Sequence, residues 1–239
     1  MKKPLIILTG PTAVGKTKLS ISLAKAVNGA IISADSMQVY RHMDIGSAKI
    51  RPEEMCGVPH YLIDVLDPSE EFHVVKFVEL AHEAMEKIYA AGQIPIVTGG
   101  TGFYIQALLK EVDFTESHGE LPIRKQLEEK AATEEGAAEL YRELSEVDPA
   151  SAETIHPNNV KRVIRALEYY HETGQKISEH NEEQKQKESP YCSAYFVLND
   201  ERSILYDRID RRVDQMIRDG LVDDCLLYTS PSPRDAHES

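Results

Sequence analysis

The sequence has few cysteines and no long hydrophobic run. Its three cysteines, Cys56, Cys192 and Cys225, are odd in number and far apart, which argues for free thiols in a reducing compartment. The longest apolar run, residues 5–8, is far shorter than the ~18 residues that span a bilayer, and it begins almost at the N-terminus. We therefore expect a cytoplasmic protein without a membrane segment.

Positive charge is also scarce. The chain has 27 Lys and Arg against 40 Asp and Glu, a net charge of −13, which argues against a surface coated with basic residues for non-specific nucleic-acid binding. A local basic groove remains compatible with this balance. The nine histidines include no HExxH pair, so the sequence predicts no zinc site.

The remaining composition is that of an ordinary globular protein. At 239 residues, with 41% hydrophobic and 28% charged residues, the chain suits one core domain with a smaller appendage. Alternating strand-like and helix-like segments predict an α/β domain with a parallel sheet. The expected strands are residues 5–8, 30–33, 61–65, 94–97 and 195–198. The expected helices include one with Leu19, Leu23 and Val27 on a single stripe and one over residues 203–219.

Strand-like runs are missing between residues 117 and 189, where the chain becomes rich in Glu, Lys and Ala. We interpret this stretch as a helical insertion. The predicted domains are an α/β core over 1–116, a helical insertion over 117–190, a return to the core over 191–227 and a tail over 228–239.

A phosphate-binding loop follows the first expected strand. The motif GxxxxGK[ST] is matched between a strand and a helix by Gly10, Pro11, Thr12, Ala13, Val14, Gly15, Lys16 and Thr17. Such a loop aims backbone N–H groups at phosphate oxygens, Lys16 adds a charge, and the Thr17 hydroxyl can bind Mg²⁺. The motif specifies a di- or triphosphate and leaves open which one, ATP included.

Two further turns are expected at the same edge of the sheet. Asp35 follows the second strand and is either the N-cap of a helix over the following segment or a base or metal-linked carboxylate. The turn at residues 99–102 follows the strand at 94–97, and Thr98 stands where Walker-type ATPases usually have an acid. This absence weakens the interpretation as a motor or switch NTPase.

Two clusters of basic residues have helical spacing. Lys161, Arg162 and Arg165 lie after Asn158, and they form either a solvated face or an anion-binding surface. Arg208 and Arg212 lie one turn apart beside an apolar stripe of Leu205, Ile209, Val213 and Met216. Their shared face suits them to grip phosphate oxygens.

Several sequence blocks together resemble the tRNA dimethylallyltransferase (isopentenyl-tRNA transferase) family. Beside the phosphate-binding loop, the matching blocks are residues 35–46, 57–60, 99–104, 156–159, 162, 165–168, 206–209 and 212–216. The resemblance covers about residues 4–224. Ser47 and Tyr61 depart from the usual Thr and His without touching a proposed chemical group.

The resemblance implies a P-loop NTPase-like core and transfer of a dimethylallyl group from dimethylallyl diphosphate to tRNA. The acceptor is N6 of the adenine at position 37, just 3′ of the anticodon, and diphosphate is released. Asp35 would accept a proton from the amine, with Thr101 nearby, while Lys16, Mg²⁺ at Thr17 and Arg208 would stabilise the leaving group. Arg212 would also bind the diphosphate.

The target base has to leave its stack to react. The loop around Asp35, Ser36, Met37 and Gln38 would receive it, with Thr101. The predicted tRNA-binding residues of the insertion are Arg124, Asn158, Lys161, Arg162 and Arg165. We expect a monomeric enzyme. The alternatives are a P-loop small-molecule or nucleoside kinase and a non-catalytic RNA-binding module.

The last residues depart from the family pattern. After residue 227 the sequence loses its apolar periodicity and places prolines at 231 and 233. Family members continue with further helices, so we expect the 239-residue chain to be a shortened form with a non-native tail over 228–239. Such a chain is expected to keep the phosphate-binding core and to transfer prenyl groups poorly or not at all.

Overall fold

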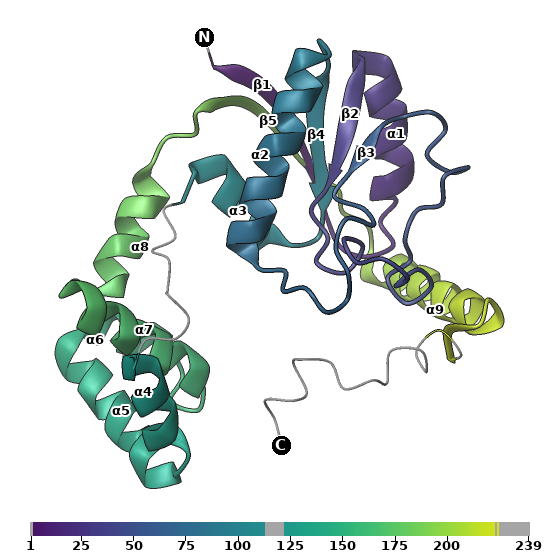
Figure 1. Ribbon diagram of the computed structural model, residues 1–239. Helices are drawn as coiled ribbons and strands as arrows, with labels where there is room; N and C mark the ends of the chain where they lie inside the picture. The colour runs from purple at the N-terminus through teal and green to yellow at the C-terminus, as the bar shows by residue number, and fades with distance from the viewer. Residues whose placement is uncertain (1, 113–121, 223, 225–239) are drawn as a thin grey trace. The chain divides into compact units, whose positions relative to one another are not determined.

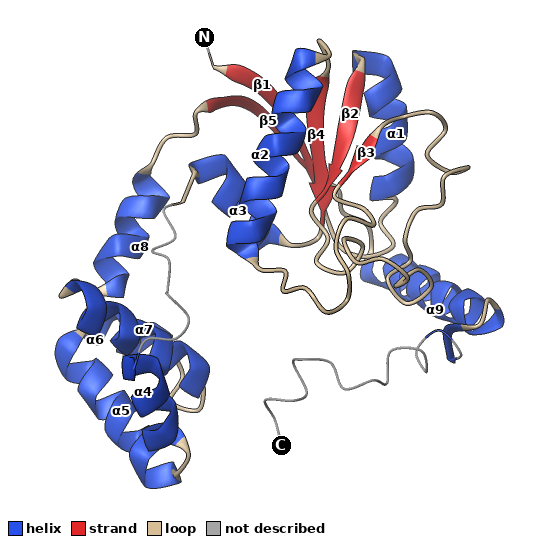
Figure 2. Cartoon of the chain, in the orientation of Figure 1, coloured by secondary structure: helices blue, strands red, loops and turns tan. Residues whose placement is uncertain are grey.

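The computed structural model describes residues 2–112, 122–222 and 224 of the chain. Within them lies one sheet, with the strand order β3-β2-β4-β1-β5 and only parallel pairs (Figures 1 and 2). Its strands are β1 (Lys3–Thr9), β2 (Gly29–Ser33), β3 (His60–Tyr61), β4 (Ile94–Gly99) and β5 (Tyr191–Val197). The predicted α/β class with a parallel sheet is confirmed.

Helices cover both faces of this sheet. One face packs on α1 (Lys16–Val27), and the other packs on α2 (Val74–Ala90) and α3 (Gly102–Lys110) (Figure 2). Alternation along β1 produces the two layers, since Leu5 and Ile7 join the α2 and α3 core while Ile6 packs with α1. The sheet is therefore the buried centre of an α/β layer structure.

The packing of α1 differs from the predicted stripe. Leu19 is 43% exposed, whereas Ser20 and Ala24 are each 1% exposed and face the sheet. Leu23 and Val27 are only partly buried. Small side chains on this face permit close packing of the helix backbone on the sheet. The predicted stripe of Leu19, Leu23 and Val27 is therefore not the most buried face of α1.

Three predicted segments also shift. The third strand is only two residues long, the fifth begins at Tyr191 rather than residue 195, and the last helix is α9 (Arg202–Arg218). Leu205 is the only residue of α9 that is buried. The apolar stripe of α9 therefore does not pack into the core as a whole. Its other residues, Ile209, Val213 and Met216, are at least partly accessible to solvent.

The chain divides into two compact units, residues 1–111 with 189–239 and residues 112–188. The described part of the second unit is helical, with α4 (Pro122–Ala131), α5 (Glu134–Val147), α6 (Pro149–Thr154), α7 (Val160–Thr173) and α8 (Ile177–Gln186). Its core includes Leu140, Leu144 and Leu167. The boundary predicted at 116 and the tail predicted at 228–239 lie outside the described residues.

Candidate active site

Three turns meet at the carboxyl edge of the sheet. They follow β1, β2 and β4, and β4 lies between the other two strands. Two close approaches there require glycine. A Cβ atom at Gly10, where φ is +152°, would lie 2.5 Å from the Leu198 carbonyl oxygen, and one at Gly99 would overlap the Ala34 carbonyl. The glycines therefore bring the loop after β1 and the loop after β2 close to their neighbouring strands.

The phosphate-binding loop ends at a left-handed residue. Gly15 has φ 95° and begins α1 without a side-chain cap, which leaves the first N–H groups of the helix available to an anion. Lys16 Nζ donates hydrogen bonds to the carbonyl oxygens of Gly10 and Pro11, at 2.8 Å each. Burial lowers the pKa of Lys16, the Asp35 carboxylate acts to raise it, and the Arg212 guanidinium lowers it. These three charges share one environment.

A cavity of about 490 Å³ opens over this loop. The predicted residues that line it come from the loop, the segment after β2 and α9: Thr12, Ala13, Gly15, Lys16, Thr17, Asp35, Met37, Gln38 and Arg212. It is also lined by Gly46, Ser47, Ala48, Gly100, Ile209, Val213 and Met216. A phosphate-binding loop, a carboxylate and an arginine thus share one cavity.

Asp35 caps a turn and lines the cavity. Its Oδ1 accepts hydrogen bonds from the backbone N–H groups of Met37 at 2.9 Å and Gln38 at 3.3 Å. The segment that follows is a turn and not a helix. The helix of the capping interpretation is therefore absent, and Asp35 caps a turn instead. This cap uses one carboxylate oxygen, so it is compatible with a chemical role.

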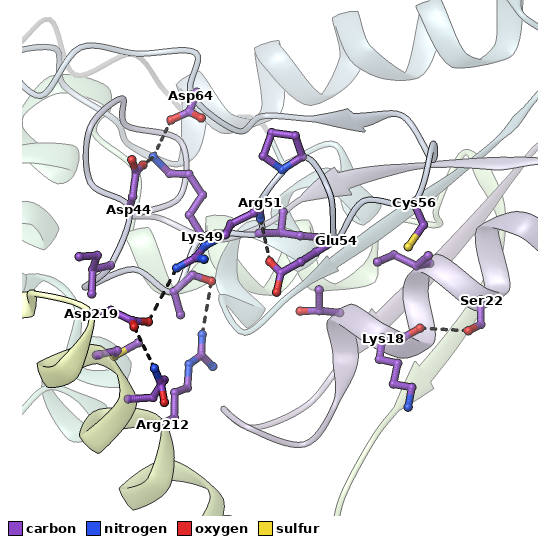
Figure 3. A pocket seen from close by; sticks show the side chains of 18 of the residues that line it. Lys18, Ser22, Asp44, Lys49, Arg51, Glu54, Cys56, Asp64, Arg212 and Asp219 are labelled. Carbon is purple, nitrogen blue, oxygen red and sulfur yellow. Dashed lines mark hydrogen bonds and ion pairs between the residues drawn. The ribbon is translucent and has the colours of Figure 1, made fainter.

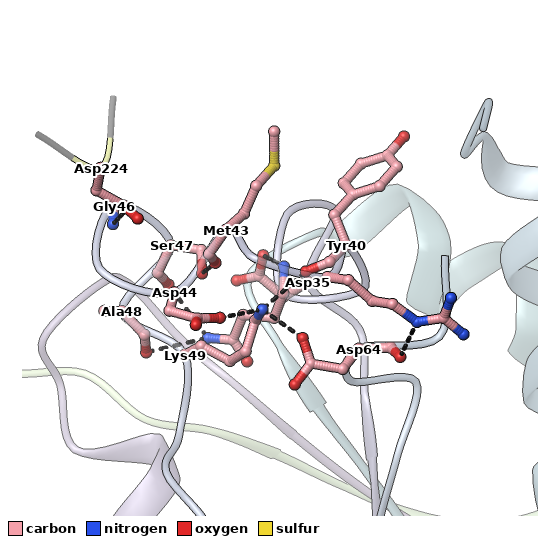
Figure 4. Close-up of polar contacts among 12 residues, drawn as sticks. Asp35, Tyr40, Met43, Asp44, Gly46, Ser47, Ala48, Lys49, Asp64 and Asp224 are labelled. Atoms are coloured by element: carbon pink, nitrogen blue, oxygen red, sulfur yellow. Dashed lines mark hydrogen bonds and ion pairs between the residues drawn. The ribbon is translucent and has the colours of Figure 1, made fainter. Parts of the chain in front are cut away.

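The segment 46–48 forms a wall that the sequence analysis did not assign. Gln38 Nε2 donates to the carbonyl oxygens of Ser47 at 3.3 Å and Ala48 at 3.4 Å, and Arg212 donates to Ala48 at 3.4 Å (Figure 4 shows the segment). Ser33 Oγ donates to Gln38 Oε1 at 3.4 Å. The only sequence feature that pointed to this segment was the block of residues 35–46, which resembles the family and ends at Gly46.

A second cavity has a volume of about 1130 Å³ (Figure 3) and shares lining residues with the first. Thr17, Ala48, Arg212 and Met216 line both. The second cavity is also lined by cations and acids from α1, the segment 44–56 and the end of α9: Lys18, Lys25, Arg51, Glu54 and Asp219. Of the phosphate-binding loop, Thr17 alone lines this second cavity.

Two predicted catalytic residues line neither cavity. Arg208 forms an ion pair with Asp200, at 2.9 Å. Thr101 precedes α3, and its carbonyl oxygen accepts from the N–H groups of Tyr104 and Ile105. Their assignment to the reaction stays a prediction, whereas Arg212 lies at the cavity.

In the helical unit, two of the predicted basic residues meet a buried acid. Glu168 is fully buried, and its Oε2 lies 2.9 Å from Arg165 and 3.6 Å from Arg124. Lys161 and Arg162 are exposed on the first turn of α7, after the exposed Asn158. The geometry therefore divides the predicted set into an acid-bound pair and an exposed group.

Within the described residues, no group of three or more His, Cys, Asp or Glu side chains could hold a metal ion. The same residues form no helix long and apolar enough to cross a membrane.

Comparison with known proteins identifies the family. The model of the IPP transferase family matches residues 38–231. The chain belongs to the IPP transferase family. The tRNA dimethylallyltransferase of Lachnoclostridium phytofermentans is 64% identical over 224 residues, which are 94% of this chain and 71% of that relative. The predicted family resemblance is confirmed.

Solved structures agree with the fold. A eukaryotic dimethylallyltransferase acting on tRNA matches with a TM-score of 0.84 and 38% identity, over 97% of this chain and 57% of that one. The full-length tRNA isopentenylpyrophosphate transferase of Bacillus halodurans matches with a TM-score of 0.66 and 45% identity, over 98% of this chain and 72% of that one. This member of the IPP transferase family thus spans part of the length of each of these relatives.

Proposed function

We propose that the chain transfers a dimethylallyl group from dimethylallyl diphosphate to N6 of the adenine at position 37 of tRNA. The observation that carries the proposal is that the cavity over the phosphate-binding loop has an apolar wall. Ile209, Val213 and Met216 lie on one face of α9 at spacings of four and three residues, and all three line this cavity. Such a wall suits a short hydrocarbon group attached to a diphosphate.

The exposed apolar surface of the wall supports this donor. Val213 is 43% exposed, and Met37, which also lines the cavity, is 39% exposed. An apolar group that enters the cavity removes this surface from water, at about 25 cal/mol per Å². A nucleotide, with its polar ribose, gains less from the same wall, which favours the prenyl donor over the kinase alternative.

The diphosphate end of the donor suits the loop and two cations. As the C–O bond of the donor breaks, the leaving diphosphate gathers negative charge, and Lys16, Arg212 and the N–H groups that open α1 stabilise it. Lys16 exchanges its bonds to Gly10 and Pro11 for bonds to phosphate oxygens. We assign this role to Arg212 because it lines the cavity, while Arg208 is held by Asp200.

Asp35 is the group that accepts the amine proton. An exocyclic adenine amine is a weak nucleophile, and a carboxylate that takes its proton assists attack on the allylic carbon. One oxygen of Asp35 is used by the turn, and the residue lines the same cavity as Lys16. Attack and departure can therefore take place within one cavity, between a carboxylate and a cationic loop.

Mg²⁺ fits the residues present as an ion held mainly by diphosphate and water. Thr17 supplies a hydroxyl at the cavity, and the described residues offer no cluster of acids that could enclose the ion. Mg²⁺ commonly keeps several waters and uses few protein ligands at phosphate sites. When bound, it neutralises charge on the diphosphate.

The tRNA contacts follow from the exposed basic residues of the helical unit. Lys161 and Arg162 lie at the N-terminus of α7 beside Asn158, where phosphate oxygens can approach them.

We further propose that the enzyme works in the cytoplasm, as a monomer. Neither proposal changes the chemistry of the site.

A labelled-substrate assay tests the proposed function. The chain is incubated with labelled dimethylallyl diphosphate and unmodified tRNA, and in parallel with labelled ATP and small alcohols. Label on tRNA, lost in the Lys16→Ala variant, supports the proposal. Phosphorylated alcohol without prenylated tRNA would establish the kinase. tRNA binding without either product would contradict the proposed transfer.

A further inference from the structure

Lys49 is a buried cation outside the phosphate-binding loop. Its side chain is 4% exposed, and Nζ donates to Tyr40 O at 2.7 Å, Asp44 Oδ1 at 2.6 Å and Asp64 Oδ1 at 2.5 Å. An ammonium group has three N–H donors, so these three oxygens use all of them. Lys49 is therefore committed to the protein and not to a ligand, although it borders the larger cavity.

The three acceptors come from two separate loops of the chain (Figure 4). Tyr40 and Asp44 belong to the loop after β2, while Asp64 lies beyond β3. Asp44 and Asp64 are 65% and 52% exposed, so the buried ammonium ties two surface loops to one point. Lysine is almost never fully buried without such partners, because the charge has to be compensated.

The backbone around Lys49 needs this support. Ala48 has φ 47° and Asp64 has φ 55°, left-handed conformations that are uncommon for residues other than glycine. Such conformations cost on the order of 1 kcal/mol or more and persist where neighbouring contacts hold them. The ammonium contacts Asp64 directly and is one residue from Ala48.

The strained residue Ala48 is also the one that faces the site. Its carbonyl oxygen accepts from Gln38 Nε2 and from the Arg212 guanidinium, at 3.4 Å each, and the residue lines both cavities. A rotation of this peptide would remove an acceptor from Gln38 and Arg212 together. The position of Arg212 at the diphosphate therefore depends on the conformation of residues 44–49.

We infer that Lys49 is a positioning residue: it holds residues 44–49 so that the Ala48 carbonyl orients Gln38 and Arg212 at the cavity. Lys49 touches no substrate in this arrangement. The consequence for catalysis rests on the proposed function, whereas the effect on the wall of the cavity does not.

The variant Lys49→Met tests the inference through two measurements. The first is hydrogen exchange of the Ala48 and Lys49 amides, which donate to Ile45 O and Asp44 O. The second is calorimetric binding of inorganic diphosphate. We expect exchange at residues 44–49 to rise by about tenfold and diphosphate affinity to fall by about tenfold, the size of a coupling between contacting residues.

The matched control is Lys76→Met, which removes an exposed ion pair with Glu79 from α2, away from both cavities. It should change neither measurement. Asp64→Asn keeps the lysine and weakens one of its contacts, so it should shift both measurements in the same direction by less. This second variant decides the question if Lys49→Met does not fold.

A double variant separates positioning from general loosening. If Lys49 acts through Arg212, adding Lys49→Met to Arg212→Met should cost little further diphosphate affinity. Unchanged exchange at residues 44–49 would overturn the inference, and so would fully additive losses of affinity. A wild-type chain that binds no diphosphate would count against the proposed donor site, while the exchange measurement alone would still decide the role of Lys49.

Discussion

Replacing Gly99 by alanine should displace Asp35 without touching it. Gly99 ends β4, and a methyl group there would lie 2.6 Å from the carbonyl carbon of Ala34, the residue directly before Asp35. Ordinary contact begins at 3.4 Å, so one backbone has to move by at least about 0.8 Å, and the carbonyl oxygen of Ala34 lies closer still. Since the Ala34 N–H is held by Thr98 O at 2.8 Å, this movement distorts the β2–β4 pairing where the carboxylate is positioned.

The expected losses follow from that displacement. Overpacking of a buried site costs about 1–3 kcal/mol of stability. A misplacement of about 1 Å at a reacting group costs on the order of 100-fold in rate. We therefore expect Gly99→Ala to fold with reduced stability and to transfer prenyl groups about 100-fold more slowly, with diphosphate affinity changed far less.

The assay combines urea unfolding, calorimetric diphosphate binding and labelled prenyl transfer. Gly102→Ala is the matched control, because a Cβ atom at Gly102 meets nothing within 4 Å and the residue begins α3. It should leave all three measurements near the wild-type values. A Gly99→Ala variant with wild-type stability and transfer rate would refute the argument that close packing of these two strands positions Asp35.

Three further predictions concern the carboxylates and the basic helix. Asp35→Asn should keep diphosphate affinity nearly intact and lower the transfer rate, measured under single-turnover conditions, by roughly 10²–10⁴. A collapse of diphosphate affinity would instead assign Asp35 to binding of the donor. Burial alone would raise the pKa of Asp148, but hydrogen bonds from two serines bring that pKa below its usual value of 3.8. The ionised Asp148 therefore stabilises the folded protein above pH 3.8, and this stabilisation is lost as the pH falls further. The urea midpoint of the wild type should drop in acid, and that of Asp148→Asn should drop less. Parallel pH profiles of the two proteins would contradict this. Replacing Lys161 and Arg162 together by alanine should weaken tRNA binding and reduce its salt dependence by about one counterion per lost phosphate contact, and an unchanged salt slope would make this helix face merely solvated.

The elements of the core could be predicted because their signals are local. Apolar runs located the four longer strands, helical spacing located α1 and α9, and the phosphate-binding motif fixed one turn. The position of β4 between β1 and β2 could not be predicted from local sequence patterns, because strand order depends on contacts between distant segments. The same limit explains α1, whose small residues pack on the sheet while Leu19 faces solvent.

The site was predictable where a motif carries its own geometry. The loop around Lys16 and the turn at Asp35 lie where parallel strands end, and both line one cavity. Arg208 and Arg212 share a helix face by spacing, but the rotation of α9 about its buried Leu205 decides which one reaches the cavity. Lys49 gave no sequence signal, because its role comes from oxygens that only the folded loops bring together.

Thr98 bears on how a phosphate-binding loop can support transfer instead of hydrolysis. This residue lies on β4, next to β1 in the sheet, and its buried hydroxyl has no hydrogen-bond partner among the described residues. An acid at this position in motor and switch NTPases serves the metal and phosphates. Here the carboxylate of the cavity is Asp35, which follows β2, one strand further from the phosphate-binding loop. The proposed reaction needs that displacement, because the proton to be accepted is on the incoming amine and not on a water beside the phosphates.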